Sequence, residues 1–157
     1  MIRKVLVALD GSARAPGVFE RAAAIAARFG AALVPFRAIH VPPEFPAAAA
    51  GSESDGLPAR LARLALEEIG HVTAQASLEG LSLAAPIVRS GDPSRLILEV
   101  SEEVDADLIV MGSHGYSGID RILGTTAAHV ANQARRDVLV VHQRNGVTPG
   151  GGGRSGE

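Results

Sequence analysis

A chain of 157 residues and 16.1 kDa, of which 46% are hydrophobic, is long enough for one domain with a packed core. Its formal net charge of −2 gives no electrostatic reason to expect a nucleic acid or an anionic membrane as a partner, and the absence of cysteine excludes disulfides, thiolate metal sites and thiol catalysis. No apolar run approaches the roughly 18 residues of a membrane helix, and Val5 to Leu9 is too short for the apolar core of a signal peptide, so we expect a cytoplasmic protein without membrane insertion.

The chain predicts strands that alternate with helices. Apolar runs without polar alternation predict strands buried on both faces, and apolar residues at helical spacing predict the helices. In chain order, the expected elements are a strand from Ile2 to Leu9, a helix from Ala15 to Phe29, a strand from Ala31 to Val41, a loop from Pro42 to Pro58, a helix from Ala59 to Leu78, a strand from Leu83 to Arg89, a helix capped by Asp92 or Ser94, a strand from Leu108 to Met111, a helix from Thr125 or Thr126 to Ala134, and a strand from Val138 to His142.

Some local features refine this outline. Pro86 interrupts the third strand and indicates an edge or a bulge there. Because only 3% of the residues are aromatic, the core is expected to consist of Ala, Val, Leu and Ile. The glycine-rich tail, residues 145–157, is expected to be disordered, which leaves a single domain over residues 1–144. The inward stripe expected for the first helix is Val18, Ala22, Ile25, Ala26 and Phe29.

Strands that are covered on both faces by helices imply a doubly wound, five-stranded parallel sheet. Such sheets bind ligands beyond the carboxyl ends of their strands, at the point where the strand order reverses. The loops that follow Leu9, Val41, Arg89 and Met111 are therefore the places where we expect functional residues. His40 lies at the end of an apolar strand, and we expect it to be structural rather than a ligand.

The loop after the fourth predicted strand carries the clearest pattern, with glycines at 112, 115, 118 and 124 and Thr125-Thr126 at the start of a helix. Glycines leave no Cβ in the way, so that backbone N–H groups can converge on an anion, and a helix N-terminus also favours phosphate. A phosphate site without a lysine is one interpretation. The other is that the glycines only permit tight turns and that Thr125 is an ordinary helix cap.

Three segments resemble parts of one known family. They are KVLVALDGS at Lys4 to Ser12, Ile39-His40-Val41, and DLIVMGSHGYSGIDRILGTTAAHVANQARRDVLVV at Asp107 to Val141, of which the third is the most specific. Together they resemble the ATP-binding branch of the universal stress protein family, from about Met1 to His142. The resemblance implies a Rossmann-like fold of the adenine nucleotide alpha-hydrolase type, with strand order 3-2-1-4-5.

The resemblance also implies a role for individual residues. Asp10 would face the ribose and phosphates or help to hold Mg²⁺, although Asp10-Gly11 is also a common turn in which the carboxylate accepts a local N–H. Val41 would frame the adenine and Met111 would pack beside the nucleoside. The residues that would approach or hold the phosphates of ATP are Gly112, Ser113, His114, Gly115, Gly124, Thr125 and Thr126.

One departure from the family pattern lies in the glycine loop. The family's motif has nine residues between its second and third glycines, whereas eight separate Gly115 from Gly124 here. All the required residue types are present, so we interpret the shorter loop as a variant of the same site.

Two functions other than nucleotide binding are possible for a domain of this kind. A nucleotide-free interaction module would carry large side chains at positions 112, 115 and 124, whereas this chain has Gly112, Gly115 and Gly124. A weak ATPase would need a base near the terminal phosphate, for which Asp10 is the only plausible carboxylate, so we expect slow hydrolysis or none. The sequence has no Walker, dinucleotide or nucleophile-elbow motif. The resemblance further implies a homodimer that pairs through the edge formed by Val138, Leu139, Val140 and Val141.

Overall fold

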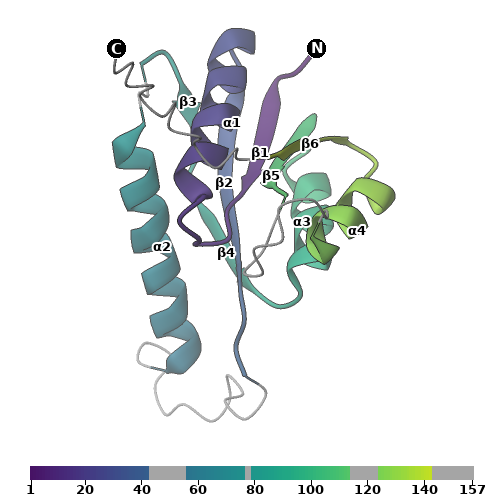
Figure 1. Cartoon of the computed structure of the whole chain (residues 1–157). Coiled ribbons are helices and arrows are strands. Elements are labelled where there is room, and N and C mark those ends of the chain that lie inside the picture. Colours follow the sequence, from purple (N-terminus) through teal and green to yellow (C-terminus); the bar gives the residue numbers. More distant parts are fainter. Residues whose placement is uncertain (43–55, 77–78, 114–123, 143–157) are drawn as a thin grey trace, which may run out of the picture.

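The computed structural model describes residues 1–42, 56–76, 79–113 and 124–142. Helices and strands alternate along the chain for most of its length (Figure 1). In chain order they are β1 (Lys4–Ala8), α1 (Ala15–Phe29), β2 (Ala32–Ile39), α2 (Leu57–Gln75), β3 (Ser82–Leu83), β4 (Ile87–Ser90), α3 (Pro93–Glu103), β5 (Leu108–Gly112), α4 (Thr125–Gln133) and β6 (Asp137–Val141).

The elements follow the sequence pattern closely, and the differences lie at their ends. α1 has the predicted bounds, whereas α2 begins at Leu57 rather than Ala59, because Pro58 takes one of the first helical positions, where its missing N–H costs nothing. β2 ends at Ile39, before Val41. The predicted loop over residues 43–55 and the predicted tail over residues 145–157 lie outside the described residues.

The six described strands form one parallel sheet in the order β3-β2-β1-β5-β6, with β4 also paired to β2. The doubly wound parallel sheet is thus confirmed, but with six strands instead of five. The predicted third strand is two strands, and both pair with β2, so that the predicted order 3-2-1-4-5 holds once they are counted together. The break falls around Pro86, which has no N–H to donate to a ladder.

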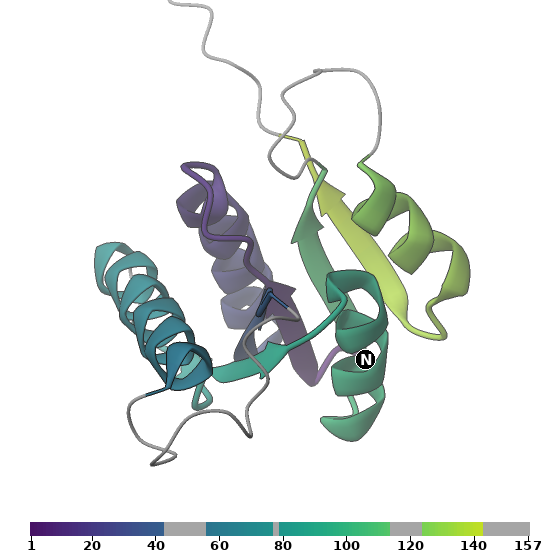
Figure 2. The same cartoon turned by 90° about the horizontal axis from the view of Figure 1, so that it is seen from below.

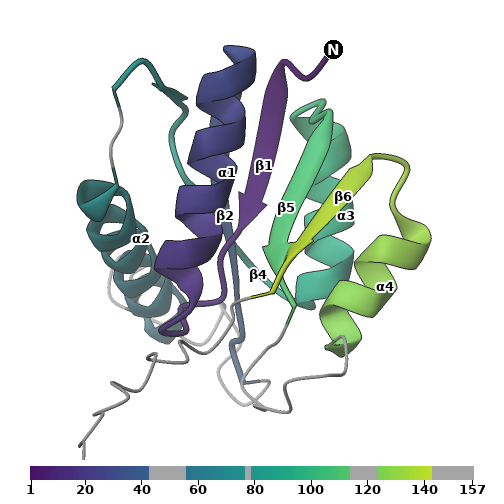
Figure 3. The ribbon, with the colours of Figure 1, turned by 45° about the horizontal axis from the view of Figure 1, so that its top comes forward.

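Helices cover both faces of the sheet, α1 and α2 on one side and α3 and α4 on the other (Figure 2). Figure 3 shows β1 and β5 side by side at the centre and β6 beyond β5. Two apolar clusters fill the layers above and below the strands. None of the helices in the described ranges is long and apolar enough to cross a membrane.

Most buried residues of the core are Ala, Val, Leu and Ile, as predicted. The largest fully buried side chains are nevertheless the aromatic ones of Phe19 and Phe36. In α1 the predicted stripe is correct for Val18, Ala22 and Ala26, but Phe29 is 52% exposed. The buried face of α1 consists of Ala15, Val18, Phe19, Ala22, Ala23 and Ala26.

Asp92 rather than Ser94 caps α3. Its Oδ1 atom accepts a hydrogen bond from the Arg95 backbone N–H at 2.9 Å and another from the Ser94 hydroxyl at 2.6 Å. The Ser94 hydrogen bond, followed by that from Arg95, lowers the pKa of the Asp92 carboxyl below its ordinary value. The charged carboxylate is therefore the form that stabilises the start of α3.

We expect Asp92→Ala to lower the free energy of unfolding by about 1 kcal/mol at neutral pH, as loss of an N-cap does. Because the pKa of Asp92 is lower in the folded state, its contribution is present above the unfolded pKa of about 3.9 and is lost as the pH falls through the folded pKa. Urea denaturation across the acid range should show that the free energies of unfolding of the unmodified protein and of Asp92→Ala converge as the pH falls. Asp92→Asn keeps a capping oxygen without the charge, and its difference from Asp92→Ala should be independent of pH. An Asp92→Ala difference that stays constant across the acid range would contradict the assignment.

Candidate functional site

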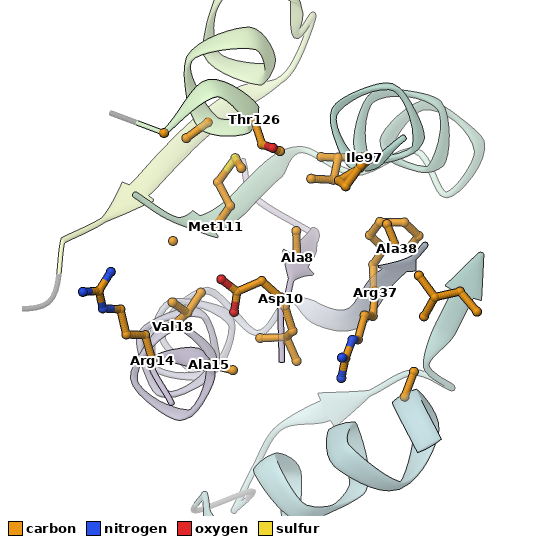
Figure 4. Close-up of a pocket in the computed structure, with 18 of the residues that line it drawn as sticks. Ala8, Asp10, Arg14, Ala15, Val18, Arg37, Ala38, Ile97, Met111 and Thr126 are labelled. Carbon is orange, nitrogen blue, oxygen red and sulfur yellow. The ribbon is translucent and has the colours of Figure 1, made fainter. Parts of the chain in front are cut away.

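A cavity of about 760 Å³ opens at the carboxyl ends of β1, β2 and β5 (Figure 4). Its wall also includes residues from the start of α1, from α2, from α3 and from the start of α4. The chain leaves β1 toward β2 on one side, whereas β5 and β6 lie on the other side of β1, so the strand order reverses between β1 and β5. The cavity therefore lies at the switch point where parallel α/β sheets bind ligands.

Most of the predicted site residues come together in this wall. The adjacent ends of β1 and β5 supply Asp10 and Met111, because Ala8 and Met111 are partners in the parallel ladder. The predicted site residues that line the cavity are Asp10, Met111, Gly112, Ser113, Gly124, Thr125 and Thr126. His114 and Gly115 lie outside the described residues.

The end of β2 contributes to the cavity in a different way from the prediction. Among the described residues, the wall includes Ile39 and His40 but does not include Val41. β2 stops at Ile39, where Gly91 donates its N–H to the Ile39 carbonyl at 3.0 Å. His40, which was expected to be structural, is exposed at the cavity.

Asp10 both holds a local turn and faces the cavity. Its Oδ1 atom accepts the Ser12 backbone N–H at 2.9 Å, and the Ser12 hydroxyl accepts the Arg14 N–H at 3.2 Å. This turn carries the chain from β1 into α1. Figure 4 shows the Asp10 carboxylate in the middle of the site, with the Arg14 and Arg37 side chains on opposite sides of it. The two interpretations of Asp10, a turn residue and a residue of the cavity wall, are thus compatible.

The two ends of the glycine loop are fixed side by side. Ser113 donates its N–H to the Val141 carbonyl at 3.0 Å, and Gly124 donates its N–H to the Ser113 carbonyl at 2.7 Å. Gly124 is the N-cap residue of α4, so the interpretation of Thr125 as the helix cap is wrong; Thr125 is the first helical residue. Within the described residues no side chain caps this helix, and its first N–H groups lie at the cavity wall.

The comparison with known proteins gives the family. The chain matches the universal stress protein family over residues 1–142. It belongs to this family. This universal stress protein is 34% identical over 146 residues to universal stress protein A homolog 1 of Coxiella burnetii (strain RSA 493 / Nine Mile phase I). The match covers 88% of this chain and 95% of that protein.

Solved structures of the family share the fold. A universal stress protein in complex with cAMP has a TM-score of 0.61 and 30% identity, and the match covers 90% of this chain and 97% of that chain. Hypothetical protein MJ0577 of Methanocaldococcus jannaschii has a TM-score of 0.76 over 93% of this chain and 99% of that chain, and at 24% identity this likeness concerns the fold alone. The resemblance seen in the sequence is therefore confirmed for the family and the fold.

Sequence reasoning missed three charged residues of the cavity wall in this universal stress protein: Arg14, Arg37 and Glu68. Arg37, on β2, forms an ion pair with Glu68 on α2, and its side chain is only 15% exposed. A signal for Arg37 exists in the sequence, since it interrupts the apolar strand ALVPFRAI. Arg14 precedes α1 at its N-cap position and has no such contrast with its neighbours.

The described side chains provide no preformed metal site. Among these residues, no group of three or more His, Cys, Asp or Glu could hold a metal ion. A single carboxylate such as Asp10 suits Mg²⁺ only when phosphate oxygens complete the coordination, which is the ordinary way in which this ion binds with nucleotides.

Proposed function

We propose that this universal stress protein binds ATP, with Mg²⁺, in the cavity at the carboxyl ends of β1, β2 and β5 and acts as a regulatory binding protein. The observation that supports the proposal is the juxtaposition, at the switch point of the sheet, of the start of α4, which no described side chain caps, with Asp10 and Arg14 around one cavity. Its volume of about 760 Å³ falls in the range of roughly 300–1,000 Å³ typical of small-molecule sites. The related protein solved in complex with cAMP supports an adenine nucleotide as the ligand class.

The two ends of the cavity differ in chemistry and suggest an orientation for the ligand. At the start of α4 the wall offers backbone N–H groups and the hydroxyls of Thr125 and Thr126, and at the start of α1 it offers the Arg14 guanidinium; these groups suit phosphates. Near α2 it offers Leu61, Leu64 and other apolar groups, which suit a flat base. Asp10 lies between them, where a carboxylate meets either ribose hydroxyls or a magnesium ion.

The direct test is mass spectrometry of any nucleotide released from gently purified protein, followed by calorimetry with ATP and Mg²⁺. We expect co-purified or added adenine nucleotide to bind and to raise the melting temperature, because a ligand that binds only the folded state stabilises it. Absence of heat with millimolar ATP would refute the proposal. Phosphate release should stay close to the rate in buffer, and a rate far above it that is lost in Asp10→Ala would favour the weak ATPase instead.

Arg14→Ala should weaken ATP binding by roughly 10- to 100-fold, the range expected when one charge-assisted hydrogen bond to phosphate is lost. Adenosine, which has no phosphate, should lose little affinity. Calorimetry with both ligands measures the difference. Arg21→Ala is the matched control, because Arg21 is an exposed arginine of α1 that does not line the cavity. Equal losses for ATP and adenosine would show that Arg14 acts on the fold and not on phosphate.

We also propose a homodimer formed through β6. This strand ends the path β3-β2-β1-β5-β6 and carries the half-buried residues Val138, Leu139 and Val140. An edge strand with apolar side chains favours pairing with another chain. Size-exclusion chromatography with light scattering should give twice the chain mass, and the mass of a single chain at micromolar concentration would refute the dimer.

A further inference from the structure

Two charged residues, one on β2 and one on α2, interrupt otherwise apolar parts of the cavity wall. Arg37 is the one charged residue of β2, ALVPFRAI, and its ion pair joins the sheet to Glu68 on α2. On α2, the cavity is lined by Leu61, Leu64, Ala65 and Glu68, which follow the spacing of one helix face. Glu68 therefore ends a row that is otherwise apolar.

A charge pair in such a place needs a reason. Taking an arginine largely out of water costs free energy that its ion pair only partly offsets, and aliphatic residues at both positions would pack without that cost. The Arg37 side chain is 15% exposed, whereas Glu68 remains 51% exposed and lines the cavity. Within the pair, Arg37 is therefore largely buried, whereas Glu68 is accessible from the cavity.

The Glu68 carboxylate can accept hydrogen bonds from a ligand. An ionised carboxylate has about four acceptor positions on two oxygens, and the ion pair with Arg37 uses Oε2. Leu61 and Leu64, on the preceding turns of α2, supply an apolar surface beside it. A flat heteroaromatic ring with a donor group at its edge complements this combination, whereas ribose hydroxyls do not need the apolar surface and have Asp10 nearer the centre of the cavity.

We infer that Glu68, held by Arg37, selects a nucleobase with an exocyclic amine at the α2 end of the cavity. The inference rests on the proposed nucleotide site and adds the group that reads the base. The amine donates to the Glu68 carboxylate, and a base without it covers part of that carboxylate without replacing the hydrogen bond from water that it displaces. Sites built to hydrogen-bond a ligand group discriminate strongly against analogues that lack it.

The experiment compares ATP with purine riboside triphosphate, which differs by the absence of the 6-amino group. In the unmodified protein, calorimetry should give ATP roughly 10- to 100-fold tighter binding. In Glu68→Ala the ratio should fall to about 2-fold or less, because the acceptor is absent from both complexes. Glu67→Ala is the matched control; Glu67 is the neighbouring exposed glutamate of α2, does not line the cavity and should leave the ratio unchanged.

Two further variants separate recognition from folding. Glu68→Gln keeps the size of the side chain and one neutral acceptor, so its ratio should lie between those of the unmodified protein and Glu68→Ala. Arg37→Ala should reduce the ratio while Glu68 is still present, and Arg37→Lys should restore part of it. Equal affinity for both nucleotides in the unmodified protein, or a ratio that survives Glu68→Ala, would overturn the inference while leaving nucleotide binding intact. Failure of both nucleotides to bind would refute the proposed function itself.

Discussion

Replacing Gly11 with alanine should lower the free energy of unfolding by about 2–3 kcal/mol and weaken nucleotide binding. Gly11 has φ +71°, in the left-handed region, which alone costs another residue about 1–2 kcal/mol. An added Cβ would also lie 2.6 Å from Cζ and 2.7 Å from Nη1 of Arg37. The guanidinium, at the end of a flexible side chain, would have to shift away from this turn, which disturbs its ion pair with Glu68.

The two parts of this cost can be measured separately by urea denaturation. Gly30→Ala is a matched control, since Gly30 has φ +64° and no heavy atom within 4 Å of an added Cβ, so it should lose the backbone part alone. Arg37→Ala should make Gly11→Ala less costly, by a coupling of about 0.5–1.5 kcal/mol, and should not change the cost of Gly30→Ala. If Gly11→Ala and Gly30→Ala cost the same in both backgrounds, the Arg37 guanidinium does not pack against this turn.

Much of the candidate site follows from local sequence patterns joined to one rule of topology. The apolar strands fix a parallel sheet, and the carboxyl ends of parallel strands share an edge. For this reason Asp10 after β1 and Met111 at the end of β5 could be predicted to lie together although they are distant in sequence. Thr125 and Thr126 follow because the chain must return to the same edge to begin α4.

The features that the sequence could not predict depend on how helices pack on the sheet, or on where the hydrogen-bonded pairing of two strands ends. Arg37 meets Glu68 because α2 lies over β2, and no local pattern gives the rotation of α2 about its axis. The wall contains Ile39 instead of Val41 because β2 leaves the sheet at Ile39, its last ladder partner being Ser90 of β4. The split of the third strand had a local cause in Pro86, yet the pairing of both halves with β2 is a property of the whole sheet.

The same limit applied to α1, where helical spacing allowed two choices of inward face. Val18, Ala22 and Ala26 belong to both, and adding Phe29 instead of Phe19 rotates the face toward the wrong neighbour. Small alanines leave the choice open because they give little contrast between faces. The structure buries Phe19 completely and leaves Phe29 52% exposed, so this one phenylalanine fixes the rotation of the helix against β1 and β5.

Phe19→Ala should therefore destabilise the protein by about 3–5 kcal/mol, the range for removing a fully buried phenylalanine, whereas Phe29→Ala should cost about 1 kcal/mol or less. The two substitutions remove the same atoms from the same helix and differ in burial, 0% against 52% exposed, so composition and helix propensity cancel between them. Urea midpoints with unchanged m-values would measure the difference. Equal losses would mean that α1 presents Phe29 to the sheet. The start of α1, which carries Arg14 and Ala15 into the cavity wall, would then be rotated as well. The position of the Arg14 guanidinium relative to Asp10 would differ accordingly.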